Sequence, residues 1–245
     1  MNIDSLYSEF QKNNKISTDT RKSVEGSVFF CLKGPNFNGN KFGEEALKKG
    51  AKIIVTDDKK YANKKNFYWV NDTLKCLQKL AAKHRKELKI PVVAITGTNG
   101  KTSTKNLIYE ILNEKYNVIK TTGNLNNHIG LPLSILSIDE THELAVLEFG
   151  ASKLGDITEL CEVGQPNFGL ITNIGEAHLN EFINVDNIIK TKTELWTYLV
   201  NNNGTIFLNS NDEILNKTHK ENKLFSMYNK FIFYSEKEEK IKLKS

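Results

Sequence analysis

The feature that most restricts the possible folds of this chain is the segment of residues 90–104, which has the sequence IPVVAITGTNGKTST. Residues 92–95 form a short apolar run, which predicts a buried strand. The turn of residues 97–100 contains two glycines and is followed by Lys101 and Thr102. A helical pattern comes next, and its predicted apolar side consists of Leu107, Ile108, Ile111 and Leu112. A strand, a glycine turn, a Lys-Thr pair and a helix in this order predict a phosphate-binding loop.

Each part of this loop has an expected role in binding a nucleoside triphosphate. Glycine lets backbone N–H groups face an anion, and the helix that follows adds its positive N-terminal end. Lys101 is expected to reach the β- and γ-phosphates, and the Thr102 hydroxyl is expected to bind Mg²⁺. The predicted ATP- and phosphate-binding residues are Gly97, Thr98, Asn99, Gly100, Lys101, Thr102 and Ser103.

The loop differs from the common G-x-x-x-x-G-K-[ST] pattern at one position. That pattern would place its first glycine at position 95, where this chain has Ile95, so the loop is a shortened variant. The alternative interpretation is an ordinary glycine-rich turn with a solvated Lys101. The strand, the paired glycines, the Lys-Thr pair and the helix all occur in the expected order, which makes this alternative the weaker one. These four features do not show which reaction the protein catalyses.

The composition is that of a soluble globular protein, with 39% hydrophobic and 26% charged residues in a chain of 245. No run approaches the roughly 20 apolar residues of a membrane helix, and the N-terminus lacks the pattern of a signal peptide. Three separated cysteines without metal-binding spacing fit a reducing cytoplasm. The net charge of +5 is spread along the chain without interleaved aromatic residues, so we expect no nucleic-acid binding. A modest positive field would still favour an anionic small substrate.

The order of predicted elements indicates two α/β units that meet near Pro91. In the first, strands are predicted over residues 27–32, 52–56 and 67–70, and helices over residues 42–49 and from Asp72 to Leu88. His84 falls on the apolar side of the second helix and is expected to be a packing residue. In the second unit, strands are predicted at residues 92–96, 118, 144–147, 168–174 and 205–208, and helices at residues 102–114, 156–162 and 185–200. This alternation predicts a parallel sheet covered by helices.

Three candidate groups follow the carboxyl ends of predicted strands, where ligands gather in open parallel sheets. The loop follows residues 92–96, Glu148 follows residues 144–147, and His178 follows residues 168–174. A carboxylate in this place can hold the Mg²⁺ that bridges phosphates. The alternatives are a surface acid for Glu148 and a loop histidine without a special task for His178. We favour a metal-binding role for both because they accompany the loop.

Lys192 lies on the apolar stripe of the helix predicted over residues 185–200, in line with Ile188, Leu195 and Leu199. Lysine is almost never fully buried unless it is paired. The pattern alone favours a side chain that extends along the helix and brings its amine to solvent. The alternative is a buried amine with a lowered pKa, which can react with CO₂ to give a carbamate, an anionic metal ligand.

Together these motifs resemble those of the Mur ligases, the ATP-dependent amide-forming enzymes of peptidoglycan assembly. The loop of residues 96–102 is similar to the shortened ATP loop of that family. Further similar segments are residues 19–22, 32–34, 36–39, 123–127, 129–133, 148–151, 173–179 and 192–194. The resemblance covers nearly the whole chain. It implies an α/β fold with a small UDP-substrate domain over residues 1–88 and a P-loop parallel-sheet ATP-binding domain over residues 89–245.

Within the family, the motifs are most similar to those of the member that joins D-alanyl-D-alanine to UDP-MurNAc-tripeptide. The resemblance implies that ATP phosphorylates the terminal carboxylate and that the dipeptide amine then attacks the acyl phosphate. It implies catalytic roles for Lys101, His178 and Lys192, one Mg²⁺ on Thr102 and Glu148, and a second on His178 and carbamylated Lys192. The implied substrate contacts are Thr18, Asp19, Arg21, Lys33, Asn36, Asn38, Asn126 and Asn127. A cytoplasmic monomer without membrane insertion is expected.

Three departures from the family pattern shape these expectations. The chain stops at Ser245, about half-way through the usual architecture, so we expect it to bind nucleotide weakly and not to complete ligation alone. Residues 181–184 stand where a glycine-rich turn is expected, and Asn40 stands where a histidine is expected. The alternatives are a sister ligase that adds the third stem-peptide residue, a folate-type polyglutamate ligase, and a non-catalytic UDP-sugar- or nucleotide-binding module. A further alternative, a P-loop kinase or GTPase, would have the standard loop spacing, which this chain lacks.

Overall fold

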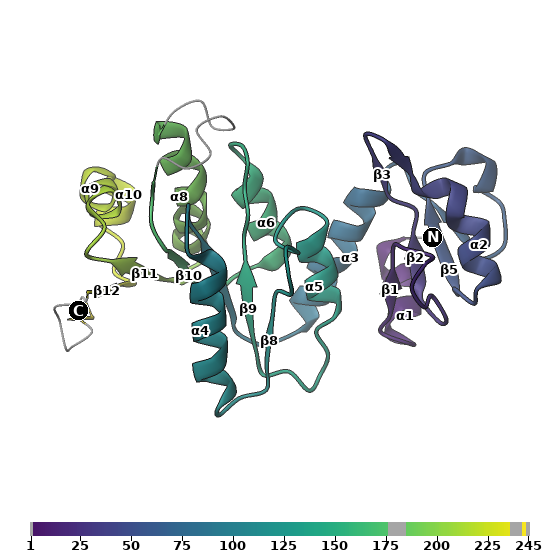
Figure 1. The fold of residues 1–245 in the computed structure, drawn as a ribbon, viewed down its shortest axis with the longest axis horizontal. Helices are drawn as coiled ribbons and strands as arrows, with labels where there is room; N and C mark the ends of the chain where they lie inside the picture. The colour runs from purple at the N-terminus through teal and green to yellow at the C-terminus, as the bar shows by residue number, and fades with distance from the viewer. Residues whose placement is uncertain (1, 176–184, 236–241, 244–245) are drawn as a thin grey trace. The chain divides into compact units, whose positions relative to one another are not determined.

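The computed structural model describes residues 2–175, 185–235 and 242–243. The chain forms two compact units, one of Met1–Leu88 with Pro132–Asp139 and the other of Lys89–Leu131 with Glu140–Ser245. The first unit is drawn from purple to blue in Figure 1, and most of the second from teal to yellow. Residues 132–139 therefore return to the N-terminal unit, which the alternating sequence pattern does not reveal.

The N-terminal unit is built on a four-stranded parallel sheet with the strand order β1-β2-β5-β6. The strands are β1 (Ile16–Ser17), β2 (Val28–Phe30), β5 (Ile53–Thr56) and β6 (Phe67–Trp69). The helices are α1 (Ile3–Gln11), α2 (Gly43–Lys48) and α3 (Thr73–Glu87), with short 3₁₀ turns η1 (Gly39–Phe42) and η2 (Lys59–Tyr61). A small hairpin joins β3 (Lys33–Gly34) to β4 (Phe37–Asn38). The strands and helices predicted for this unit are present, with ends shifted by a few residues.

The helix α1, the strand β1 and the short hairpin strands β3 and β4 were not predicted. The sequence does carry a signal for α1, because the Asn2 side chain accepts a hydrogen bond from the Ser5 N–H and caps the first turn. Leu6, Tyr7 and Phe10 then bury one side of this helix. Two or three apolar positions in a short helix are a weak pattern, and the burial that stabilises it is tertiary.

His84 holds the first unit together, and its predicted packing role is confirmed. Its Nδ1 lies 3.1 Å from the hydroxyl of Tyr7 on α1, and its Nε2 lies 2.8 Å from the carbonyl oxygen of Ile138. The Phe10 ring meets the imidazole edge-on. The imidazole therefore links α1, α3 and the returning segment of residues 132–139.

Burial lowers the pKa of His84, although the hydrogen bond to Ile138 opposes this shift. The folded unit favours the neutral imidazole, so the unfolded chain binds more protons below its ordinary pKa of 6.5. The His84 contribution should be fully present above that pH and should fall as the pH is lowered through it, by at most about 1.4 kcal/mol per pH unit. We expect His84→Gln to flatten the dependence of the unfolding free energy on pH just below 6.5. Urea titrations followed by Trp69 fluorescence in a Trp196→Phe background measure this, and equal slopes would contradict it.

The second unit contains a seven-stranded sheet with the order β13-β12-β11-β10-β7-β9-β8. Its strands are β7 (Val92–Thr96), β8 (Val118–Lys120), β9 (Leu144–Glu148), β10 (Phe168–Ile171), β11 (Thr205–Asn209), β12 (Phe231–Tyr234) and β13 (Lys242–Leu243). All neighbouring strands run parallel except β12 and β13. The predicted parallel sheet is thus confirmed. Because β9 and β10 flank β7 on opposite sides, the strand order reverses there, and such points form ligand sites.

Helices cover both faces of this sheet, as expected for a parallel sheet. Among the described residues, the helices of this unit are α4 (Lys101–Asn113), α6 (Asp156–Gly164), α8 (Val185–Asn201), α9 (Glu213–Glu221) and α10 (Lys223–Ser226). The helix α5 (Gly130–Leu136) begins in this unit, but most of it belongs to the segment that returns to the first unit. Ile108 and Leu112 of α4 pack on one face, against a cluster that contains Ile95 and Val146. On the other face α8 comes so close that a Cβ at Gly169 would lie 2.6 Å from a methyl group of Leu199. Among the described helices, none has both the length and the apolarity needed to cross a bilayer.

Candidate functional site

The loop between β7 and α4 has a backbone that requires glycine. Gly97 has a φ of +143°, and a Cβ at this position would collide with Thr172. Gly100 has a φ of +76° and is the N-cap of α4, where no side chain caps the helix. The first amides of a helix have no partner within the helix. The start of α4 therefore offers uncapped N–H groups and a positive helix end to an anion.

A second loop, which follows β10, fixes the conformation of the first. The Thr98 N–H donates to the Asn173 carbonyl at 3.0 Å, and the Asn99 N–H donates to the Asn173 side-chain oxygen at 3.1 Å. In return, the Thr172 hydroxyl donates to the Asn99 carbonyl at 2.6 Å. The strand β10 ends at Ile171 instead of the predicted residue 174, because the backbone after it makes these loop contacts. The loop is thus shaped before any anion is bound.

Lys101 folds back over the same loop. Its Nζ donates to the carbonyl oxygens of Gly97 and Thr98 at 2.8 and 2.9 Å. Burial lowers the pKa of this amine, while the charge of Glu148 acts in the opposite direction. An amine already held above the loop loses less conformational freedom when it binds a phosphate oxygen.

Glu148, at the end of β9, is the centre of the polar network beside the loop. Its carboxylate is only 3% exposed, so the alternative interpretation as a surface acid is wrong. The Oε2 atom accepts hydrogen bonds from the Thr102 hydroxyl at 2.9 Å and from the Lys105 Nζ at 3.3 Å. The Oε1 atom accepts from the Asn126 amide at 2.9 Å. The structure therefore brings together three residues predicted for the site and adds a fourth, Lys105.

Lys105 was missed because the predicted buried side of α4 is only partly right: Ile108 and Leu112 do pack on the core, but the other two predicted residues do not. Leu107 and Ile111, counted on the apolar side, are 65% and 71% exposed. Lys105 is 2% exposed and faces inward with Ile108 and Leu112. Thr102, anchored to Glu148, fixes the rotation of the helix, and the residues three and four positions further along share its side. The sequence did contain a signal, because Lys105 follows Thr102 by three residues and Lys101 by four, and helix residues at these spacings share one side.

The network has the oxygen atoms that a nucleotide-bound Mg²⁺ requires. Within the part of the chain that the structure describes, no three His, Cys, Asp or Glu side chains are grouped to hold a metal. Mg²⁺ bound with phosphates needs fewer protein ligands, often one or two oxygen atoms with waters completing the octahedron. The Thr102 hydroxyl and the Glu148 carboxylate, 2.9 Å apart, are oxygens of this kind beside the loop. These residues fit the ion that the sequence predicts.

Lys192 on α8 is 3% exposed, so the predicted extension of its amine to solvent is wrong. The whole side chain is enclosed, together with its neighbours Thr191 and Thr193. His178 and residues 181–184 lie outside the described residues, so the predicted pairing of His178 with Lys192 stays a prediction.

Glu194 belongs to the segment that resembles the second-metal region, but it has a structural role here. Its Oε1 accepts from the Gly155 N–H at 2.7 Å, and its Oε2 accepts from the Thr158 N–H at 2.8 Å and from the Thr158 hydroxyl at 3.0 Å. The N-cap of α6, Gly155, has no side chain with which to cap the helix. Glu194 on α8 therefore caps α6 from a distance and fixes the two helices together.

A cavity of about 280 Å³ adjoins the Glu148 network. Asn126 lines it while its amide holds Glu148, and a Cβ at Gly150 would lie 3.0 Å from the Asn126 side chain. Asn127 also lines the cavity, and its side-chain oxygen accepts from the Ile129 and Gly130 N–H groups. The other lining residues are His128, Ala151, Ser152, Asp156, Glu159 and Leu160. Both predicted asparagines thus lie where a substrate would meet the network.

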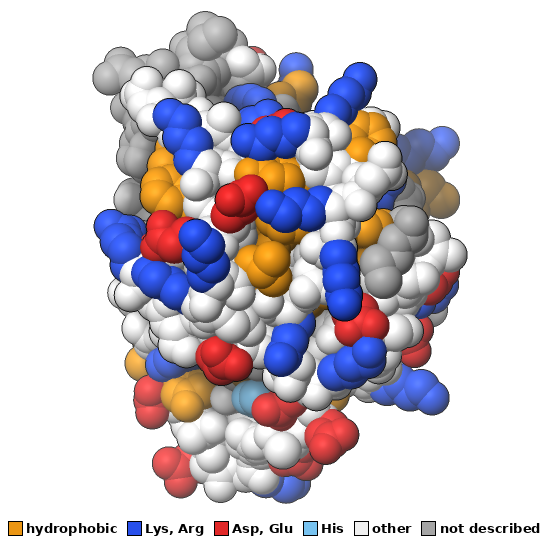
Figure 2. Space-filling view, turned by 90° about the vertical axis from the view of Figure 1, so that its right-hand side faces the viewer, with side chains coloured by type: hydrophobic (Ala, Val, Ile, Leu, Met, Phe, Trp, Pro, Cys, Tyr) orange, Lys and Arg blue, Asp and Glu red, His pale blue; other side chains and the backbone are white. Residues whose placement is uncertain are grey.

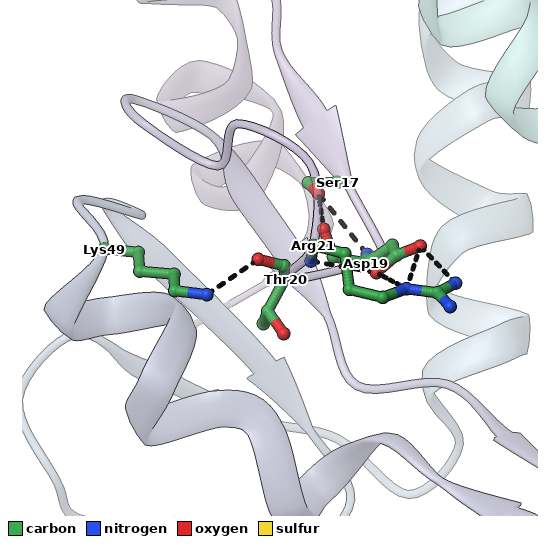
Figure 3. Close-up of polar contacts among 5 residues, drawn as sticks. All are labelled: Ser17, Asp19, Thr20, Arg21 and Lys49. Atoms are coloured by element: carbon green, nitrogen blue, oxygen red, sulfur yellow. Dashed lines mark hydrogen bonds and ion pairs between the residues drawn. The ribbon is translucent and has the colours of Figure 1, made fainter.

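The N-terminal unit has its own cavity, of about 480 Å³. It is lined by Thr18, Asp19, Thr20, Arg21, Phe29, Phe37 and Phe42. The Phe37 and Phe42 rings stack with centroids 5.6 Å apart, and Phe37 is 51% exposed. Figure 3 shows the Asp19–Arg21 ion pair at 2.7 Å and the Lys49 amine, which donates to the Thr20 carbonyl. The hydrogen bonds from Arg21 lower the pKa of the Asp19 carboxyl to about 2.

Three predicted substrate residues of this unit, Lys33, Asn36 and Asn38, do not line that cavity. Lys33 pairs with Asp57 at 2.9 Å, and the Asn38 side chain caps the turn that follows it. Asn40, which replaces the expected histidine, is buried and donates to Asp57 at 2.6 Å. Figure 2 shows a face on which Lys and Arg side chains lie among Asp and Glu side chains. Ion pairs such as Lys33–Asp57 show how positive charge on this unit is locally balanced.

A glycine loop at the reversal point of a parallel sheet, with a Lys-Thr pair at the helix start, defines a P-loop nucleotide-binding protein. The model of the Mur ligase middle domain matches residues 95–245, and that of the Mur ligase family catalytic domain matches residues 13–85. The chain belongs to the Mur ligase family.

Its relatives include the UDP-N-acetylmuramoyl-tripeptide–D-alanyl-D-alanine ligase of Bacillus subtilis, 41% identical over 182 residues, which are 74% of this chain and 40% of the relative. The Synechocystis protein of the same name is 36% identical over 89% of this chain and 48% of its own length. The crystal structure of MurF ligase from Thermotoga maritima in complex with ADP has a TM-score of 0.81 and 33% identity. It is matched over 91% of this chain and 51% of that one. The chain spans about half the length of the curated relatives it matches.

Proposed function

We propose that the protein to which this chain belongs is an ATP-dependent ligase of peptidoglycan precursor synthesis. It adds D-alanyl-D-alanine to UDP-MurNAc-tripeptide through an acyl phosphate. The observation that carries the proposal is the contact of the Thr102 hydroxyl with the Glu148 carboxylate, 2.9 Å apart and beside Lys101. The names of the relatives at 36–41% identity support the choice of substrates.

The chemistry needs positioning and charge neutralisation more than covalent help from the protein. The amides at the start of α4 would hold the phosphates, and the Lys101 amine, already held over the loop by the Gly97 and Thr98 carbonyls, would meet the β/γ-phosphate region. Thr102 and Glu148 would hold a Mg²⁺, which would supply positive charge to offset the negative charge of the nucleotide and of the attacking carboxylate. Asn126 and Asn127 place the peptide carboxylate beside this network.

We propose that Lys192 and His178 hold a second Mg²⁺ at the acyl end of the reaction. The enclosed position of Lys192 on α8, within the segment that resembles the second-metal region of the family, supports this role. Nucleophilic addition of the neutral amine to CO₂ forms an N–C bond and releases one proton. The product is a carbamate whose oxygen atoms can bind the ion.

We propose that residues 1–88 are the UDP-substrate domain and residues 89–245 the ATP domain. The cavity with the Phe37–Phe42 stack and the Asp19–Arg21 pair offers an aromatic face and hydrogen-bonding groups to a uridine nucleotide. Binding energy at that remote end would orient the reacting carboxylate. Two of the proposed substrates, ATP and UDP-MurNAc-tripeptide, are cytoplasmic nucleotides, so we place the protein in the cytoplasm. We also propose that it is a monomer.

An assay of the protein that contains this chain in full tests the proposal. ADP release should require UDP-MurNAc-tripeptide together with D-alanyl-D-alanine. Release that requires UDP-MurNAc-dipeptide and a single amino acid would instead identify the sister ligase, and release with folate and glutamate would identify the polyglutamate ligase. The 245-residue chain alone should bind nucleotide weakly and release no ADP.

A further inference from the structure

The buried ion pair beside the loop has a feature that the proposed reaction does not explain. Lys105 and Glu148 are 2% and 3% exposed, and their charged atoms are 3.3 Å apart. Lysine is almost never buried to this degree without a partner, so the carboxylate accounts for its position. A neutral side chain would pack on the sheet beside Ile108 at a smaller desolvation cost. Stability alone therefore does not explain why a positively charged side chain is found at position 105.

The charges around Glu148 give a functional reason. Without nucleotide, the carboxylate is already neutralised by Lys105, and Lys101 lies nearby as a second positive group. A divalent cation that bound Glu148 alone would add two positive charges beside two ammonium groups. The phosphates of a nucleotide bring enough negative charge to reverse this balance.

We propose that Lys105 makes metal binding at Glu148 conditional on nucleotide. Lys105 occupies the Glu148 Oε2 atom when the site is empty of phosphate and repels a free divalent cation. The cation then enters with the nucleotide and not before it. This inference rests on the proposed function, because it assumes that Thr102 and Glu148 hold the ion. Lys105 is a positioning residue and touches no substrate in this scheme.

Binding of Mn²⁺, used as a probe for Mg²⁺ and followed by electron paramagnetic resonance, tests the inference on the purified chain at about pH 8, where carboxylates are ionised. The wild-type chain should bind Mn²⁺ weakly without nucleotide, and ADP should tighten that binding. Lys105→Met should bind Mn²⁺ without nucleotide about tenfold more tightly than the wild type, and the effect of ADP should shrink by the same factor. Lys105→Arg should restore the weak binding, because it restores the charge.

The matched control is Lys115→Met, an exposed lysine beyond the far end of α4, which should behave as the wild type. Glu148→Gln reports whether the Mn²⁺ measured is at this site. Equal Mn²⁺ affinities of wild type and Lys105→Met without nucleotide would overturn the inference. If Lys105→Met does not fold, the wild-type chain is used for the test. Tight binding of Mn²⁺ to the wild type without nucleotide would also overturn the inference, provided that Glu148→Gln abolishes this binding. Failure of the wild type to bind ADP at all would instead count against the proposed function.

Discussion

Replacing Lys101 with methionine should weaken the binding of ADP to this chain by about 30- to 100-fold. The Lys101 amine is held over the loop by the carbonyls of Gly97 and Thr98, 2.8 and 2.9 Å away, so it is in place to meet a phosphate oxygen. A charge-assisted hydrogen bond in a partly buried site contributes about 2–3 kcal/mol, which corresponds to the expected loss. Methionine keeps the length and the packing of the side chain but removes its charge and its donors.

Isothermal titration with ADP and Mg²⁺ measures the effect of this substitution. Lys115→Met is the control, because it removes an exposed lysine about 20 Å away, beyond the opposite end of α4. The control should lose less than about twofold in affinity, since exposed charges at that separation are screened. A Lys101→Met chain that binds ADP as the control does would show that the loop does not receive the phosphates.

Breaking the buried Lys105–Glu148 pair should destabilise the second unit more than any surface change. Either Lys105→Met or Glu148→Gln leaves one buried group without its partner, at an expected cost of about 3–5 kcal/mol in unfolding free energy. The double variant should cost clearly less than the sum of the two, because it leaves no unpaired charge.

Urea unfolding followed by Trp196 fluorescence measures this cycle. Trp196 is buried on α8, and the chain has two tryptophans, so a Trp69→Phe background makes Trp196 the single reporter of the second unit. The matched control is the exposed pair Lys217–Glu221, 3.9 Å apart, whose coupling should stay below about 0.5 kcal/mol. Additive effects at Lys105 and Glu148 would mean that the two charges do not stabilise each other.

The loop and the sheet could be predicted because their signals are local. The glycines at positions 97 and 100, Lys101 and Thr102 define the anion site within a few residues. Apolar runs bounded by polar turns predicted β7 and β9, since strands buried on both faces are continuously apolar. Glu148 was found for the same reason, as the polar residue that ends such a run.

What could not be predicted depends on contacts between distant parts of the chain. The buried side of α4 was predicted correctly for Ile108 and Leu112 but not for Leu107 and Ile111. The rotation of the helix depends on the contact of Thr102 with Glu148, which joins residues 46 positions apart. The return of residues 132–139 to the N-terminal unit depends on contacts such as that of Ile138 with His84. The burial of Lys192 contradicted a general preference for lysine to extend to solvent, because the packing of α8 in the folded unit encloses its side chain.

We claim that the loop and Glu148 form one site for a nucleotide and its divalent cation. Calorimetric titration of the wild-type chain and of Glu148→Gln with ADP up to ~1 mM, with and without Mg²⁺, tests this. The wild type should bind ADP more tightly when Mg²⁺ is present, and Glu148→Gln should lose that gain while it keeps the Mg²⁺-independent part. Equal Mg²⁺ effects in the two proteins, or no ADP binding by the wild type, would contradict the claim.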